Sequence, residues 1–153
     1  MHGRPAEGCT YAIAGRSIYM SEEVNPVKRV LLWGNALLAR PAPVTEAEVR
    51  EMWTEDGSMM VNGQVKCSGI GALVRHFEEL RAKLKRVHVQ MPYAISVESG
   101  PTIAVRYVID VEHLNGMRDK VHVAAFFTVH DGKIQSMDEV AWFEKSEIAL
   151  EKH

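Results

Sequence analysis

Apolar side chains recur at helical spacing in the first half of the chain, and local polar residues indicate where two helices begin. Asn25 followed by Pro26 favours a helix start, because proline is tolerated at the first helical position. The apolar positions that follow continue until Pro41 ends the pattern. Thr45 and Glu48 form a capping box, in which each side chain accepts a hydrogen bond from the other residue's backbone amide. A short second helix is therefore predicted after Thr45.

A third helix is predicted over residues 69–85, where one stripe is apolar and the other face is charged. From Val87 the hydrophobic period changes to two, which predicts four long strands. These strands are residues 87–98, 102–114, 118–130 and 133–145. Asn115-Gly116 and Asp131-Gly132 stand at two of the junctions and suit type I′ turns. We therefore expect the strands to pair as an antiparallel meander.

A small hairpin is predicted before the third helix, from residues 58–61 and 64–67 around Asn62-Gly63. Helices come first and the meander comes last, an order that indicates an α+β fold and argues against a parallel doubly wound sheet. Residues 1–22 are interpreted as an irregular N-terminal extension. The folded domain is accordingly predicted over residues 23–153.

Composition narrows the classes of partner. The chain has 153 residues, 46% of them apolar, which is enough for one core. Its formal net charge is −2 without a basic stripe, so we expect neither nucleic acid nor a membrane surface as a partner. No apolar run reaches the roughly 18 residues of a membrane span, and the N-terminus lacks a secretory layout. Cys9 and Cys67 match no metal clip or disulfide framework, so a cytoplasmic protein with reduced thiols is expected.

Short motifs follow one another along the chain in a characteristic order. They are Trp53-x-x-Asp56, Asn62-Gly63, Gly69 before a helix with His76-Phe77, and the run from Phe127 to Ile134. Together they resemble the SnoaL-like, nuclear-transport-factor-like superfamily over residues 25–145. The resemblance implies a cone-shaped, curved antiparallel sheet wrapped around helices, as in cystatin-like barrels, with an enclosed pocket and commonly a dimer. Its members include ketosteroid isomerases, epoxide hydrolases, polyketide cyclases and dehydratases, among which fold alone does not choose.

Comparison with ketosteroid isomerases argues against that activity. By ungapped matching, the general-base aspartate of those enzymes falls on Val61 and their oxyanion aspartate falls on Ala124. Their tyrosine from the first helix falls on Val30. Because a proton shuttle needs an ionisable group at the first position and hydrogen-bond donors at the others, steroid isomerisation by that mechanism is not expected.

Limonene-type epoxide hydrolases give a different match. The resemblance places Asp110 on one catalytic aspartate and Glu139 on the second acid. Two such carboxyl groups could divide base and acid roles if one environment raises a pKa. Val108 occupies the position of that family's arginine. Arg106 is the preceding residue on the same face of the strand.

Alternation brings the candidate catalytic residues onto one face, provided that the strands pair as predicted. A tight Asp131-Gly132 turn places Ala124 opposite Glu139, so that His122 and Glu139 share a face. Asp110 joins them only if the preceding hairpin contains a bulge or a longer loop.

We therefore predict Asp110 as general base, Glu139 as acid or orienting group, His88 and His122 as proton-transfer helpers, and Arg106 as a charge partner. The alternative is structural. The two histidines would then be satisfied by backbone carbonyls or water, and the carboxylates would form an ion pair with Arg106. The side chains predicted to line a soft apolar cavity are Trp33, Met52, Met60, Met91, Phe126 and Met137, although such residues are also ordinary core.

Two functions stay open on these grounds. One is a cofactor-independent isomerase, cyclase, dehydratase or hydrolase acting on a small apolar or polyketide-like molecule; the other is a non-catalytic module that binds a ligand or a partner chain. No metal is predicted, because Glu112, His113 and His122 lack ligand spacing. Both functions are compatible with a homodimer through the convex sheet face. The apolar residues predicted there are Val121, Val123, Phe127, Val129, Ile134, Val140 and Trp142.

Overall fold

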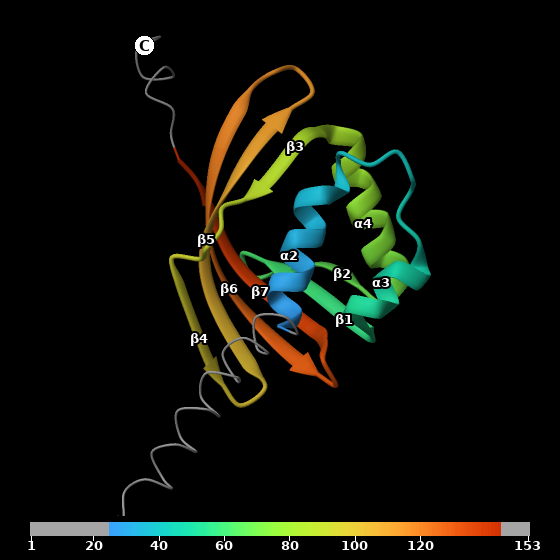
Figure 1. The fold of residues 1–153 in the computed structure, drawn as a ribbon, viewed down its shortest axis with the longest axis vertical. Coiled ribbons are helices and arrows are strands. Elements are labelled where there is room, and N and C mark those ends of the chain that lie inside the picture. The colour runs from blue at the N-terminus through green and yellow to red at the C-terminus, as the bar shows by residue number, and fades with distance from the viewer. Residues whose placement is uncertain (1–24, 145–153) are drawn as a thin grey trace, which may run out of the picture.

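The computed structural model describes residues 25–144, so the predicted extension at residues 1–22 lies outside the described part (Figure 1). Within this part of the chain, three helices and seven strands form an α+β arrangement. The helices are α2 (Pro26–Leu37), α3 (Glu46–Met52) and α4 (Ile70–Lys83). The strands are β1 (Trp53–Val61), β2 (Gln64–Ser68), β3 (Leu84–Val89), β4 (Ile95–Ser99), β5 (Thr102–His113), β6 (Arg118–His130) and β7 (Lys133–Phe143).

A single curled sheet partly surrounds the helices, which all lie on its concave side (Figure 1). The strand order is β2-β1-β7-β6-β5-β3, and β4 pairs with β5 beside β3. The expected meander is formed by β5, β6 and β7. The sheet is nevertheless mixed rather than wholly antiparallel, because β1 runs parallel to β7.

The helix starts follow from the predicted caps. The Asn25 side chain accepts a hydrogen bond from the Val27 amide at 2.9 Å, ahead of Pro26 at the first turn. At α3 the Thr45 hydroxyl accepts from the Glu48 amide, and the Glu48 carboxylate accepts from the Thr45 amide. These reciprocal bonds satisfy amides that have no partner inside the helix. None of the described helices is long and apolar enough to cross a membrane.

The predicted strand over residues 87–98 is interrupted. Its two halves, β3 and β4, pair with different parts of β5, and the chain leaves the sheet between Val89 and Ile95. Pro92 lies in this interruption and follows a cis peptide bond. Because proline has no amide hydrogen, it cannot donate to a strand ladder.

Two of the three predicted turn dipeptides adopt the expected conformation. Both residues of Asn62-Gly63 and of Asp131-Gly132 have positive φ, as a type I′ turn requires. At Asn115-Gly116 only the glycine has positive φ, and a His113 amide bond to the Met117 carbonyl closes a longer loop.

The predicted register between β6 and β7 is wrong by one residue. Glu139 lies opposite Ala125 rather than Ala124, and His122 lies opposite Trp142. The cause is a bulge: Ile134 pairs with Val129 but Ser136 pairs with Thr128, which leaves one additional β7 residue between them. A one-residue shift moves every later side chain of the strand to the other face of the sheet.

The register also corrects the predicted convex patch. Val121, Val123, Phe127 and Ile134 are buried on the concave side, where they pack in the main core. Val140 and Trp142 are exposed. Inward-facing residues of β5 and β6 therefore form the floor beneath the helices.

Candidate functional site

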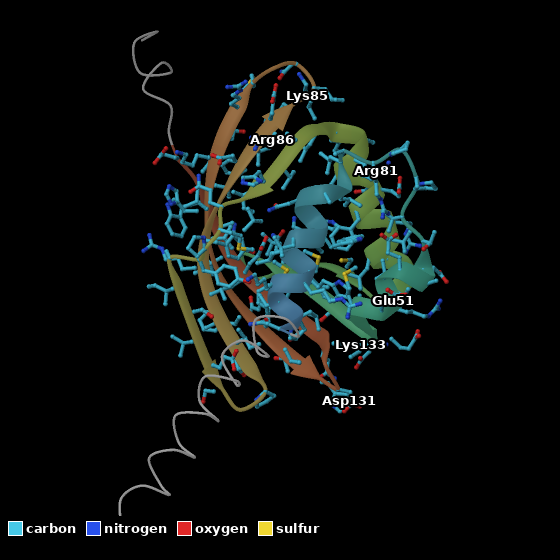
Figure 2. All side chains as sticks on the ribbon, in the orientation of Figure 1. Glu51, Arg81, Lys85, Arg86, Asp131 and Lys133 are labelled. Atoms are coloured by element: carbon cyan, nitrogen blue, oxygen red, sulfur yellow. The ribbon has the colours of Figure 1, made fainter. Side chains whose placement is uncertain are left out.

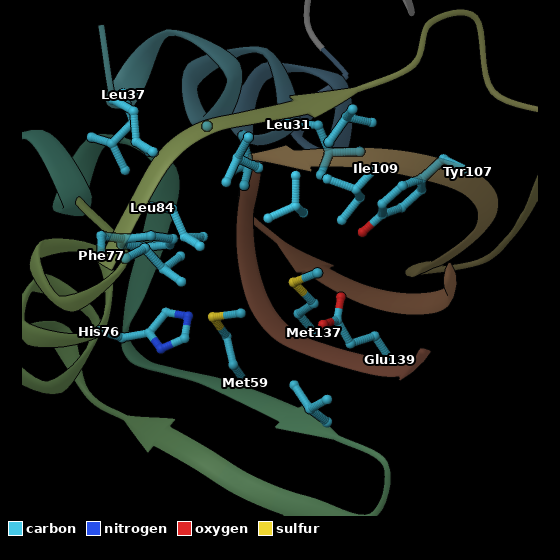
Figure 3. A pocket seen from close by; sticks show the side chains of 18 of the residues that line it. Leu31, Leu37, Met59, His76, Phe77, Leu84, Tyr107, Ile109, Met137 and Glu139 are labelled. Atoms are coloured by element: carbon cyan, nitrogen blue, oxygen red, sulfur yellow. The ribbon is translucent and has the colours of Figure 1, made fainter. Parts of the chain in front are cut away.

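An apolar cavity of about 250 Å³ lies between the helices and the concave face of the sheet (Figure 3). Helices α2 and α4 contribute Leu31 and Phe77, β1 contributes Met59, and β5 contributes Ile109. Nearly all of its other lining side chains are aliphatic or aromatic. Such a surface favours an apolar guest, because burying apolar area stabilises a complex by about 25 cal/mol per Å².

Glu139 is the carboxylic acid in the cavity wall. It lies on β7 beside the β1–β2 hairpin, where the Asn62 amide donates to the Glu139 carbonyl at 2.8 Å. The Asn62 side chain also exchanges two hydrogen bonds with the backbone of Ala141. The Asn62-Gly63 turn thus fixes the β7 backbone at the point where Glu139 enters the cavity.

Burial raises the pKa of Glu139 from its ordinary value of 4.5 to about 7. The main cause is the loss of water around the carboxyl group, which disfavours its charged form. The Tyr107 hydroxyl opposes this effect and lowers the Glu139 pKa, but only in part. Within residues 25–144, no cationic side chain forms a salt bridge with Glu139. The group therefore populates both its protonated and ionised forms near neutral pH.

Tyr107 provides a neutral donor beside this acid. The side chain is 2% exposed, and its hydroxyl points toward Glu139 (Figure 3). The hydroxyl is buried and makes no hydrogen bond of standard geometry in the described structure. Burial, followed by the nearby Glu139 charge, raises the Tyr107 pKa well above its ordinary value. The phenol therefore stays protonated and can donate to a ligand atom.

Two further polar side chains line the cavity. His76 on α4 faces it (Figure 3), and burial lowers the pKa of its imidazole, which favours the neutral ring. Trp53 also lines the cavity, and its buried indole N–H has no hydrogen-bond partner within the described residues. An unpaired buried donor costs about 1–3 kcal/mol, so an acceptor atom on a ligand could recover that cost.

Of the five expected catalytic residues, only Glu139 lines the cavity. The other four, Asp110, Arg106, His88 and His122, lie together on the outer face of the sheet. His88 pairs with Asp110 across β3 and β5, and Gln90 donates to the Asp110 carboxylate at 2.9 Å. Glu139 is separated from them because the β7 bulge turns it to the other face.

The expected apolar lining is divided in the same way. Met137 lines the cavity. Met60 and Phe126 each lie opposite Asp138 in the strand register, on the outer face of the sheet. Met52 is buried in the core, and Met91 packs against it. Trp33 contacts Phe77 edge to face at 4.8 Å and donates its indole hydrogen to Glu48 at 2.6 Å.

Sequence reasoning missed Tyr107 and His76 as site residues. The alternation along β5 could have identified the tyrosine. One face of that strand carries Ile103, Val105, Tyr107, Ile109 and Val111, whereas the other carries Arg106, Asp110 and Glu112. A strand with one wholly apolar face turns that face to the core, so the tyrosine faces the core and Asp110 faces outward.

Charged side chains are concentrated away from the cavity. Figure 2 shows the labelled charged residues, among them Glu51, Lys85 and Lys133, at the periphery of the molecule. Among residues 25–144, no three potential metal ligands converge on one point. The chemistry of the cavity therefore rests on Glu139, Tyr107, His76 and Trp53.

Solved structures at low sequence identity share this fold. A putative SnoaL-like polyketide cyclase from Jannaschia sp. CCS1 is 18% identical with a TM-score of 0.62, covering 86% of this chain and 90% of its own. An NTF2-like protein of unknown function from Exiguobacterium sp. 255-15 is also 18% identical with a TM-score of 0.62. The match covers 76% of this chain and 98% of that protein. A hypothetical protein with a ketosteroid isomerase-like fold from Catenulispora acidiphila, in complex with trimethylamine, is 14% identical with a TM-score of 0.56. The match covers 70% of this chain and 79% of that protein.

No curated protein sequence matches the chain significantly. The model of the SnoaL-like domain matches residues 43–137, which is more than half of the chain. This segment runs from the loop just before α3 through Met137 in the cavity wall. The chain therefore belongs to the SnoaL-like domain family, and its fold is the nuclear-transport-factor-like α+β cone.

Proposed function

We propose that this protein binds a small, largely apolar molecule in the cavity and moves a proton on it through Glu139. The observation that supports this most strongly is a carboxyl group with a pKa of about 7 in an otherwise apolar wall. A group whose pKa lies near the working pH serves as base in one step and as acid in the next.

The favoured reaction class is isomerisation or elimination beside a carbonyl or a similar electron-withdrawing group. The Glu139 carboxylate removes a proton from carbon, and the electron pair of the C–H bond moves toward the carbonyl oxygen. The Tyr107 hydroxyl donates a hydrogen bond to that oxygen. In an isomerisation, Glu139 then returns the proton to another carbon. In an elimination, the C–H electron pair becomes the new C=C bond as the carbonyl re-forms, and the leaving group departs with the electrons of its own bond to carbon and takes the proton from Glu139. Neither outcome changes the oxidation state of the molecule as a whole.

The size of the cavity limits the guest. Its volume of about 250 Å³ is below the ~300–1,000 Å³ of typical ligand pockets, so we expect a molecule with a single small ring or a short chain. The name of one structural neighbour, a putative SnoaL-like polyketide cyclase, agrees with a largely apolar guest.

The Glu139 base can be tested without the natural substrate, using 5-nitrobenzisoxazole. A base removes the proton from carbon 3, the C–H electrons form a nitrile, and the N–O bond breaks to release a coloured phenolate. We expect catalysis that increases with pH through a midpoint near 7. Glu139→Gln should lose at least about 100-fold in rate, the usual contribution of a positioned base.

Two controls separate this site from the rest of the chain. Glu98→Gln removes an exposed carboxylate on β4, and Asp110→Asn removes one on the outer face; both should keep the wild-type rate. Equal rates for wild type and Glu139→Gln would refute the proposal. In a ¹³C NMR titration of labelled glutamate, a Glu139 midpoint below pH 5 would also contradict it.

The second candidate is a binding module without chemistry. It is favoured by the position of Asp110, His88 and His122 on the outer face, which leaves Glu139 as the one carboxyl group among the described residues that line the cavity. It predicts that small apolar compounds raise the melting temperature of wild type and Glu139→Gln alike, without conversion. Turnover of any stabilising compound would exclude it.

A further inference from the structure

The cavity has a polar side chain on the wall that faces Glu139. Glu139 belongs to β7 and Tyr107 to β5, so both enter from the sheet, whereas His76 enters from α4. Figure 3 shows His76 and Glu139 on opposite sides of the cavity, with the side chains of Met59 and Met137 between them. The proposed proton transfer involves only the sheet side and leaves the imidazole without a part in it.

His76 lies on a face of α4 that is otherwise apolar. Leu73 precedes it by three residues and Leu80 follows it by four, so the three side chains share one face of the helix. Leu73 is buried, and Leu80 lines the cavity together with the neighbouring Phe77. A polar side chain on such a face lowers stability unless a hydrogen-bond partner satisfies it.

Among residues 25–144, the His76 side chain forms no salt bridge and no hydrogen bond. Its ring contacts Phe77 edge to face, with 5.4 Å between ring centroids. Burial is the largest influence on the pKa of His76 and lowers it, whereas the charges of Glu79, Lys66 and Lys83 act less. The ring is therefore neutral at pH 7, and one nitrogen donates a hydrogen bond while the other accepts.

A water molecule on the cavity side of this imidazole would have few other partners. A buried water typically makes about three hydrogen bonds. The side chains beside His76 in the lining are Met59, Phe77 and Leu80, and none of them carries a nitrogen or an oxygen. A ligand with its own polar atom satisfies the imidazole and buries apolar surface against these side chains at the same time.

We propose that the ligand of this cavity is a hydroxyketone: a carbonyl oxygen lies at Tyr107 and Glu139, and a hydroxyl group at the other end hydrogen-bonds to His76. The position of the carbonyl rests on the proposed function. A hydroxyl group suits His76 because it donates to a bare ring nitrogen or accepts from the ring N–H, so it matches either tautomer. An apolar ring or short chain between the two ends lies against Met59 and Met137.

The test is the binding of three matched pairs of cyclohexanones to the full chain, measured by isothermal titration calorimetry. Within each pair, the terminal CH₃ of the substituent on carbon 4 is replaced by OH. The pairs are methyl and hydroxyl, ethyl and hydroxymethyl, and propyl and 2-hydroxyethyl, which place the hydroxyl progressively farther from the carbonyl. For at least one pair we expect the hydroxyl compound to bind wild type at least as tightly as its partner, because His76 replaces the lost water.

His76→Phe keeps an aromatic ring and removes both nitrogens. The same hydroxyl is then buried without a partner, so the ratio of its Kd to that of the methyl-terminated compound should rise at least about fivefold. His76→Gln, whose amide donates and accepts, should return the ratio toward the wild-type value. His130→Phe, which replaces an exposed histidine at the end of β6, should leave the ratio unchanged. Thermal melts establish that each variant is folded.

Tyr107→Phe tests the orientation of the ligand. It should weaken both members of each pair and leave their ratio unchanged, because the ketone is common to both. A ratio that changes in Tyr107→Phe but not in His76→Phe would place the hydroxyl at the sheet side and overturn the proposal. Equal ratios in wild type and His76→Phe for all three pairs would also overturn it, as would a folded wild type that binds none of the six compounds at millimolar concentration.

These outcomes are independent of the Glu139 base. The hydroxyl selectivity of His76 is a ratio of binding constants and needs no turnover, whereas the base is judged by the rate of 5-nitrobenzisoxazole cleavage in Glu139→Gln. Loss of selectivity in His76→Phe with an unchanged cleavage rate in Glu139→Gln would refute the base alone. The reverse pattern would refute the hydroxyl site alone.

Discussion

Two glutamates of this chain experience opposite environments, and the difference separates a structural carboxylate from a reactive one. Glu48, at the start of α3, accepts hydrogen bonds from Arg40, Trp33 and the Thr45 amide. These donors, Arg40 foremost, lower its pKa from 4.5 to about 2. Glu139 is in the cavity wall and meets no cationic partner among the described residues, and burial raises its pKa to about 7. One carboxylate is fully occupied in holding two helices together, whereas the other keeps its charge state available for a ligand.

The pKa values of Glu48 and Glu139 shift in opposite directions because the two carboxyl groups have different neighbours. Glu48 stands where α2 ends and α3 begins, so donors from both elements reach it within a short stretch of chain. Glu139 stands where side chains from α2, α4, β1, β3 and β5 enclose apolar space. Loss of water disfavours a charge in both places, but only at Glu48 do hydrogen bonds offset that cost. Substitutions at the two positions should therefore change stability in opposite directions.

The largest expected effect on stability is that of Glu139→Gln, which removes the cost of ionising a buried group. Because the folded pKa is raised, wild type is relatively stable below about pH 4.5 and loses stability as pH rises to about 7. We expect the variant to exceed wild type by roughly 2–3 kcal/mol at pH 8 and to match it near pH 4. Urea denaturation at both pH values measures this. Glu98→Gln, an exposed control, should show no such difference; a variant less stable than wild type at pH 8 would contradict the buried-acid interpretation.

A smaller effect of opposite sign is expected for Glu48→Gln. The folded pKa of Glu48 is lowered, so its contribution is present above about pH 4.5 and is lost as pH falls through about 2. Allowing for solvent screening of this partly exposed pair, we expect a loss of about 1–2 kcal/mol at pH 7. Glu51→Gln on the same helix is the matched control, because Glu51 is exposed and its Arg29 contact is 3.7 Å. Similar losses for both variants would show that the Glu48 contacts add nothing specific.

The smallest expected effect is a change in the pKa of Glu139 when its neighbour Tyr107 is substituted. Tyr107→Phe removes the hydroxyl that partly lowers the Glu139 pKa, so the Glu139 midpoint should move upward from about 7. A ¹³C NMR titration of labelled glutamate detects the change. The substitution also removes a buried hydroxyl that makes no hydrogen bond of standard geometry within the described residues, so the folded state should lose little stability. A midpoint that falls instead would mean that the hydroxyl does not act on the Glu139 carboxylate.

Local sequence patterns were enough to predict most of the helices, strands and turns. The capping box at Thr45 and Glu48 and the Asn25 cap appear where predicted, because both depend on hydrogen bonds within four residues. Asn62-Gly63 and Asp131-Gly132 form the predicted turns for the same reason. The one predicted strand that failed, residues 87–98, contains Pro92, whose missing amide donor was already visible in the sequence.

The candidate site was predicted only in part. Glu139 and Met137 line the cavity as expected, but Asp110, Arg106 and His122 lie behind the sheet. Asp110 and His122 do share a face, as the sequence analysis expected with a longer hairpin loop. The single additional residue in β7 then turns Glu139 away from both.

The sequence by itself determined the helices, the turns and the apolar face of β5, because each depends on neighbours along the chain. The tertiary structure decided which face of β7 carries Glu139 and how strongly that carboxyl group is deprived of water. A bulge is chosen by packing between β7, β6 and β1, and dehydration requires walls from segments far apart in sequence. The physical reason is that strand register and burial are set by long-range contacts, whereas caps and turns are set by short-range hydrogen bonds.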